Sequence, residues 1–167
     1  MQQDPKHKKK PASFPFRKID RGTPSDQFLT QIVRLENDQL SQAIFNYADN
    51  DIEKIATAIT SARVLKELTI EKCRCTSKGF KAFVKALQET TSPLEKLHLS
   101  MIIGPPERLL PLWERLPKII LSKPGLMDVN IQNCDLPKAT HQRIMAAIST
   151  NKQNYIQRIR GELFQTH

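Results

Sequence analysis

The chain has 167 residues, of which 39% are hydrophobic and only 6% aromatic, so its length suits one domain with an aliphatic core. Its net charge of +9 is unevenly distributed, because residues 1–21 hold seven Lys and Arg side chains against two Asp. No apolar run approaches the roughly 18 residues that cross a bilayer, and no apolar secretory segment follows the basic start. These observations exclude a membrane-spanning protein and one with a signal peptide, and they predict a cytoplasmic location.

Residues 1–24 predict a flexible basic tail, because they combine Lys, Pro, Gly, Ser and Thr with few apolar side chains. Four lysines of this tail form a candidate contact for an anionic partner: Lys6, Lys8, Lys9 and Lys10. The same cluster resembles a nuclear import signal. A tail that is merely solvated is the alternative interpretation.

Two helices are predicted next along the chain. The first covers residues 25–37, where Ser25 can act as the N-cap and apolar residues recur mostly at three- and four-residue spacing. The second follows Asp51 and has four apolar residues on one face: Ile52, Ile55, Ala56 and Ile59.

An eleven-residue strand pattern then occurs twice with the same apolar positions, numbered 1, 4, 6, 9 and 11. The first copy has Leu65, Leu68, Ile70, Cys73 and Cys75, and the second has Leu126, Val129, Ile131, Cys134 and Leu136. A degenerate copy between them has Leu94, Leu97, Leu99, Ile102 and Gly104, and a worn copy before them has Leu40, Ala43, Phe45 and Ala48. Helical stretches separate the copies, so the chain is predicted to alternate strands and helices.

The helical stretch after the degenerate copy is rich in proline: Pro105, Pro106, Pro111 and Pro117. Proline inside a helix removes a hydrogen bond at a cost of about 3 kcal/mol. This helix is therefore predicted to be broken or displaced, with its apolar residues still packing inward: Leu109, Leu112, Leu116 and Ile119.

The pattern L-x-x-L-x-L-x-x-[NC]-x-L resembles the leucine-rich repeat, and Cys at position 9 resembles its ribonuclease-inhibitor-type subclass, found also in NOD-like receptors and tropomodulins. The resemblance implies an α/β fold class: a short right-handed solenoid with parallel strands on the inner face, helices on the outer face and helical caps at both ends. This domain covers residues 25–167, with repeats over about 40–150. Its caps are helices at 25–37 and 152–164, the second built on Tyr155, Ile156, Ile159 and Leu163.

If the strands stack in register, positions 3, 5 and 7 of each copy point out of the inner sheet. They form three rows of polar side chains: Glu67, Lys96 and Asp128; Thr69, His98 and Asn130; Glu71, Ser100 and Gln132. We call these nine residues the inner face. The resemblance implies that this surface holds a protein partner, and a solvated face without a partner is the alternative.

No catalytic or cofactor motif is found. His98 has no second His or Cys in the neighbouring slots, and the five glycines are isolated, so neither a metal site nor a phosphate-binding loop is predicted. The three cysteines, Cys73, Cys75 and Cys134, match no zinc or disulfide framework and are interpreted as reduced structural thiols.

The sequence therefore predicts a monomeric, non-catalytic protein–protein interaction module without a cofactor. A short, basic chain of this type resembles repeat proteins that intracellular bacteria deliver into host cells, which would place it in the host cytosol or nucleus. The alternative function is a nucleic-acid or anionic-surface binder that uses the basic tail and the C-terminal helix, where Lys152, Arg158 and Arg160 lie.

Overall fold

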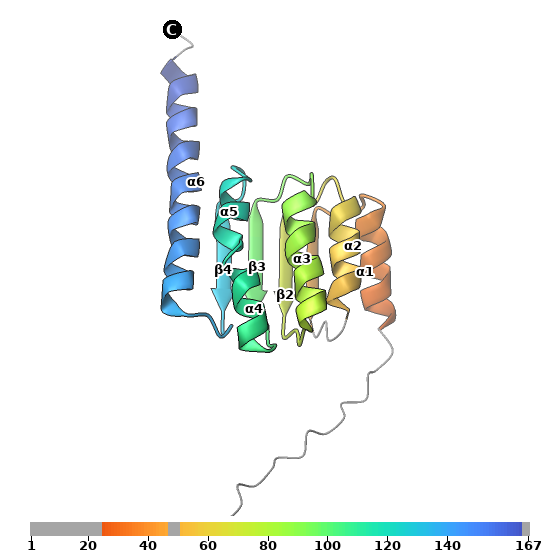
Figure 1. Cartoon of the computed structure of the whole chain (residues 1–167). Helices are drawn as coiled ribbons and strands as arrows, with labels where there is room; N and C mark the ends of the chain where they lie inside the picture. The colour runs from red at the N-terminus through yellow and green to blue at the C-terminus, as the bar shows by residue number, and fades with distance from the viewer. Residues whose placement is uncertain (1–24, 47–50, 165–167) are drawn as a thin grey trace, which may run out of the picture.

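The computed structural model describes residues 25–46 and 51–164. Within these ranges helices alternate with parallel strands, the strands stand in the sheet in their chain order, and the helices of the central part lie along one side of the sheet (Figure 1). The elements are α1 (Asp26–Glu36), β1 (Gln42–Asn46), α2 (Ile52–Ser61), β2 (Glu67–Glu71), α3 (Ser77–Glu89), β3 (Lys96–Ser100), α4 (Pro106–Trp113), α5 (Leu116–Leu121), β4 (Asp128–Gln132) and α6 (Lys138–Phe164). This order confirms the predicted α/β class.

The strands pair in the register that the eleven-residue pattern predicts. The partners across β2, β3 and β4 are Leu68, Leu97 and Val129 in one row and Ile70, Leu99 and Ile131 in the next. From β1, Ala43 and Phe45 join these rows, while Ala48 of the same worn copy lies outside the described residues. All but Ile131 are buried, so the aliphatic positions form the sheet side of the core.

The chain leaves β2, β3 and β4 through a shared turn that no glycine marks in the sequence. The first residue after each strand, Lys72, Met101 or Asn133, has a positive φ of 55°, 54° or 52°. A side chain with a Cβ pays roughly 1–2 kcal/mol for this left-handed conformation, so the surroundings must hold the turn in place. The backbone helps, because the N–H groups of Lys72 and Met101 each donate to the last carbonyl of the next strand at 2.9 Å.

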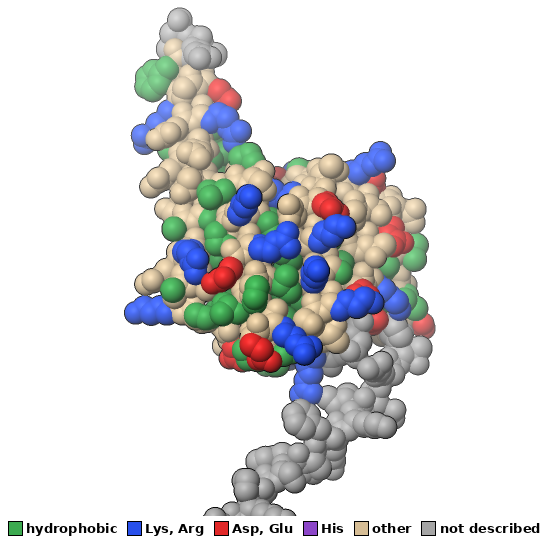
Figure 2. Space-filling view, viewed as in Figure 1, with side chains coloured by type: hydrophobic (Ala, Val, Ile, Leu, Met, Phe, Trp, Pro, Cys, Tyr) green, Lys and Arg blue, Asp and Glu red, His purple; other side chains and the backbone are tan. Residues whose placement is uncertain are grey.

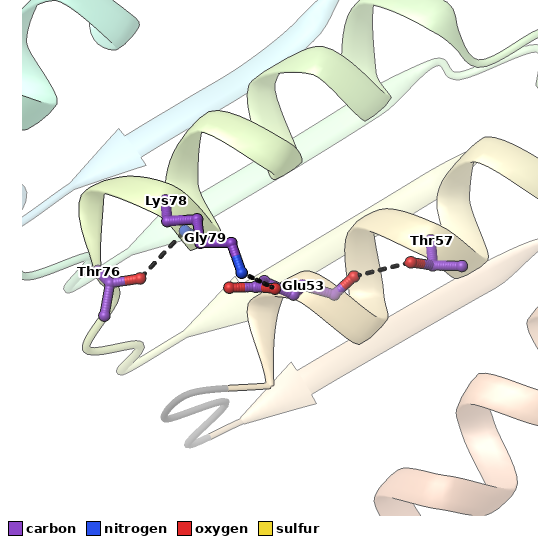
Figure 3. Close-up of polar contacts among 5 residues, drawn as sticks. All are labelled: Glu53, Thr57, Thr76, Lys78 and Gly79. Carbon is purple, nitrogen blue, oxygen red and sulfur yellow. Dashed lines mark hydrogen bonds and ion pairs between the residues drawn. The ribbon is translucent and has the colours of Figure 1, made fainter.

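Helices α2 and α3 pack closely because Gly79 has no side chain. A Cβ at this position would stand 2.6 Å from Cγ2 of the buried Ile52 on α2. The backbone N–H of Gly79 donates to Oγ1 of Thr76, the N-cap of α3, at 3.0 Å (Figure 3). At the same end Lys78 reaches Glu53 of α2 at 3.5 Å, so the cap and the ion pair join the two helices where glycine lets them approach.

The proline-rich stretch folds as two short helices, as predicted. Helix α4 ends at Trp113, and α5 begins at Leu116 with Pro117 in its first turn, where a missing N–H costs nothing. The predicted inward residues are buried, except Leu112, which is partly buried. Trp113 also lies in the core, with its ring centroid 4.6 Å from that of Phe80.

Helix α6 is one continuous helix of 27 residues, where the sequence predicted a separate cap helix over 152–164. Its first half, residues 138–151, packs on α5 through Ile144, Ala147 and Ile148. Its second half, residues 152–164, is exposed at every residue and projects beyond the rest of the molecule (Figure 1). The predicted cap is therefore wrong: the first half packs on α5, and the stripe at Tyr155 lies in the half that is exposed throughout.

The anchored half of α6 ends at a buried polar contact. The Asn151 Nδ2 amide donates to the backbone oxygens of Ile120, Lys123 and Leu126 at 2.8, 3.0 and 2.9 Å. An amide has two hydrogens, so one is shared between two of the carbonyls. Although α6 is long, no helix in the described part of the chain is apolar enough over a sufficient length to cross a bilayer.

Candidate protein-binding surface

The structure brings the nine predicted residues together on the side of the sheet opposite α2 and α3. Strand pairing places them in the three predicted rows, and each is exposed or half-buried. Strand β1 extends every row by one residue: Gln42 beside Glu67, Ile44 beside Thr69, and Asn46 beside Glu71. The rows therefore run across four strands and form a continuous solvent-facing surface.

The first row is held by polar contacts before any partner binds. Glu67 accepts a hydrogen bond from Gln42 Nε2 at 2.9 Å and pairs through its other carboxylate oxygen with Lys96 Nζ, also at 2.9 Å. The hydrogen bond and charge of Glu67 raise the pKa of Lys96, and Asp128 adds to this effect. Lys96 therefore has a defined position on the inner face, between Glu67 and Asp128.

The middle row lines a shallow hollow of the inner face. Leu68 and Leu97 form its floor, and Thr69, His98 and Asn130 stand around it beside the first-row charges. A hydroxyl, an imidazole and an amide can donate and accept hydrogen bonds, which suits recognition of a polar surface. Across the part of the chain that the structure describes, no three His, Cys, Asp or Glu side chains gather as a metal site would require.

Ile44 belongs to the middle row but is not among the nine residues predicted from the sequence. It is 44% exposed and is the one apolar side chain in the three rows as β1 extends them. The sequence does indicate its direction, because Leu40, Ala43 and Phe45 fill positions 1, 4 and 6 of the worn copy. Ile44 is therefore at position 5, which points out of the sheet. An apolar residue at the end of a polar row offers a partner a site for burial.

The cysteines lie at the turns that follow the strands and away from the inner face. Cys73 and Cys75 are buried, Cys134 is half-buried, and no disulfide joins any two of them. A hydrogen bond from the Cys73 thiol lowers the pKa of Cys75, whereas burial raises the pKa of Cys134. Cys134 Sγ also accepts a hydrogen bond from the backbone N–H of Ile102 at 3.4 Å, which links the turns of successive strands.

The two sides of the molecule differ in charge. The inner face has three carboxylates and one lysine, whereas Lys and Arg side chains are spread over the helix side (Figure 2). Several of these cations are already paired, such as Lys78 with Glu53 and Arg143 with Glu114. The predicted anionic contact at Lys6, Lys8, Lys9 and Lys10 lies outside the described residues.

No family model matches the chain, and no curated protein matches it significantly. Solved structures match its fold, among them the following two. The structure of leiomodin-1 actin-binding site 2 has a TM-score of 0.58 at 15% identity, with 87% of this chain and 100% of that chain covered. The tropomodulin C-terminal domain of Caenorhabditis elegans has a TM-score of 0.54 at 15% identity, with 80% of this chain and 98% of that chain covered.

These comparisons overturn the assignment to the leucine-rich-repeat family and to its ribonuclease-inhibitor-type subclass, together with the repeat solenoid that the assignment implied. The matching structures are leiomodin and tropomodulin domains, and no leucine-rich-repeat model matches. The assignment depended on two complete copies of the pattern, since the copy between them has Ile102 and Gly104 at positions 9 and 11. Two copies were enough to predict the strands but too few to identify a family; the likeness to the solved structures shows a shared fold.

Proposed function

We propose that this chain is a non-catalytic protein-binding module that holds its partner on the inner face. The observation that carries the proposal is the registered arrangement of the three rows, on a side of the sheet that α2 and α3 leave open. The contacts of Glu67 with Gln42 and Lys96 reduce the side-chain entropy that a partner would have to remove on binding. Ile44 supplies apolar area at the β1 end of the same surface.

Actin is the first partner to test. The support is one structural neighbour with the same fold, which is an actin-binding site of leiomodin-1. The inner face offers a carboxylate surplus and a ring of hydrogen-bonding groups around the hollow, so its partner would present basic and polar side chains there. The predicted cytoplasmic or host-cell location stays a prediction, and so does the role of a delivered bacterial protein.

The test is co-sedimentation with filamentous actin and, in parallel, a binding titration with monomeric actin. The inner-face variant combines Glu67→Lys, His98→Ala and Asn130→Ala, three half-buried residues whose replacement leaves the core intact. The matched control is Glu89→Lys at the exposed end of α3, which makes the same charge change away from the inner face. Loss of actin binding in the inner-face variant alone supports both the partner and the site.

Two other outcomes separate the partner from the site. If the wild type does not bind actin, actin is excluded, and affinity capture from a cell extract with the same pair of variants then tests the inner face. A captured protein that is lost only by the inner-face variant keeps the site, whereas equal capture by both variants rejects it. Binding that falls steeply between about 50 and 200 mM salt and needs residues 1–21 would favour the nucleic-acid alternative.

A further inference from the structure

The projecting half of α6 carries an apolar stripe that is exposed beyond the rest of the molecule, although the Arg158 guanidinium of the same helix lies 5.7 Å from the centroid of the Tyr155 ring. Its members are Tyr155, Ile156, Ile159 and Leu163, which are 39%, 48%, 37% and 64% exposed. Spacings of one, three and four residues place them along one side of the helix. A contiguous apolar stripe on a helix surrounded by solvent is typical of a docking surface.

The stripe begins beside the face that anchors α6 to the molecule and turns away from it. That face consists of Ile144, Ala147, Ile148 and Asn151. A step of four residues from Asn151 reaches Tyr155, and steps of seven and eleven reach the charged Arg158 and Glu162. Ile156 lies about 120° around the helix from Ile144. The apolar side thus turns to a new direction where the helix leaves the rest of the molecule, as expected of a helix that makes a second, separate contact.

The direction of the stripe disfavours an anionic membrane as its partner. Arg143 reaches Glu114 in the helix layer at 3.2 Å, and Ile156, Ile159 and Leu163 lie roughly half a turn from Arg143 at about 100° per residue. The stripe therefore faces the side on which the sheet is open. There the inner face carries three carboxylates against one lysine, which anionic lipids would repel.

Helix α1, at the opposite end of the molecule, has a surface that complements the stripe (Figure 1). Leu29 and Val33 are 39% and 54% exposed, one helical turn apart. Asp26 and Glu36 are exposed on either side of this pair, whereas Arg34 lies about 100° further around the helix from Val33. The surface is thus a short apolar patch between two carboxylates.

We propose that the stripe of one copy docks on the Leu29–Val33 patch of a second copy, so that the protein assembles head to tail. The projecting half has three basic side chains against one acidic, opposite in sign to the carboxylates around the patch. The lengths also match, since 13 residues of α6 span about 20 Å and the 11 residues of α1 about 16 Å. Because the two surfaces lie at opposite ends, each copy uses both and the assembly is open.

An antiparallel arrangement of the two helices satisfies the charges. It places Asp26 of one copy near Arg160 of the next and Glu36 near Lys152, with the apolar side chains between them. Pairing of two stripes with each other would instead bring the basic residues of both copies together, which disfavours a symmetric dimer. The contact is small, so the assembly is weak and forms at high protein concentration, in place of the monomer that the sequence predicted.

Sedimentation velocity from low micromolar to near-millimolar concentration tests the assembly. The wild type is expected to show a weight-average sedimentation coefficient that rises with concentration. The stripe variant, Ile156→Glu with Ile159→Glu, and the patch variant, Leu29→Lys with Val33→Lys, are each expected to stay monomeric. Gln157→Glu, on the polar side of the same α6 segment, is the matched control and is expected to assemble like the wild type.

Mixing the two monomeric variants gives the decisive measurement. Each retains one intact surface, so an equimolar mixture is expected to form a dimer and no larger species. A wild type that stays monomeric at every concentration overturns the proposal. A patch variant that assembles like the wild type also overturns the proposal, because the stripe then binds another surface. Assembly that is lost when residues 1–21 are deleted overturns it as well. Circular dichroism spectra and melting curves equal to the wild type exclude misfolding, and because no actin is present the result is independent of the proposed function.

Discussion

The two halves of α6 have the same secondary structure and opposite surroundings. In residues 138–151 the apolar side chains are buried against α5 and the half ends at the hydrogen bonds of Asn151. In residues 152–164 every side chain is exposed. An apolar stripe thus predicts a helix and a surface suited to contact, whereas the length of the neighbouring surface decides which stripe is buried within the chain.

The largest expected effect is a core substitution in the anchored half. Ile144 is 1% exposed, so Ile144→Ala removes buried methylene groups and leaves a cavity, and it is expected to lower the free energy of unfolding by about 3 kcal/mol. Ile156→Ala makes the same chemical change in the projecting half and is expected to change it by less than about 0.5 kcal/mol. Urea unfolding of both variants measures the difference; equal losses would mean that Ile156 is packed within the chain.

The next effect tests the contact that ends the anchored half. Asn151→Ala leaves the buried carbonyls of Ile120 and Leu126 without their side-chain donor and is expected to cost about 2 kcal/mol. Asn154→Ala, three residues later on the exposed part of the helix, is the control and is expected to be close to neutral. Thermal and urea unfolding check the pair, and a neutral Asn151→Ala would contradict the assigned anchor.

Two glycines extend the comparison to packed and unpacked helices. Gly79→Ala places a methyl group against Cγ2 of the β-branched Ile52, and this steric conflict outweighs the gain in helix propensity. The free energy of unfolding is expected to fall by about 1 kcal/mol in total. Gly161→Ala meets no atom within 4 Å and is expected to strengthen the projecting helix locally by up to about 1 kcal/mol. Unfolding curves measure the first change, and amide hydrogen exchange around residue 161 measures the second.

The smallest effect is expected from removing most of the projecting half. Deletion of residues 154–167 takes away no buried side chain among those described and is expected to change the free energy of unfolding by less than about 0.5 kcal/mol. The same deletion is expected to abolish head-to-tail assembly in sedimentation velocity. A large loss of stability would show that this half supports the fold of its own chain.

Much of the sheet was predictable because strand pairing depends on local periodicity. Leu68, Leu97 and Val129 share a position in the eleven-residue pattern, and this alone placed the outward residues, such as His98, in their rows. The family could not be predicted in the same way, because the degenerate copy left only two complete matches. Ile44 was missed because its copy is worn, although the inward Ala43 and Phe45 on either side of it indicate its direction.

The sequence by itself determined the α/β class, the strand register and the break at the prolines, because each depends on spacing or on a missing backbone N–H. The tertiary structure decided three other features: the left-handed turns at Lys72 and Met101, which no glycine signals; the close approach of α2 and α3 at Gly79; and the two roles of α6. These depend on which surfaces meet in space. A stripe such as Ile156 and Ile159 is apolar whether or not the neighbouring surface extends far enough to bury it.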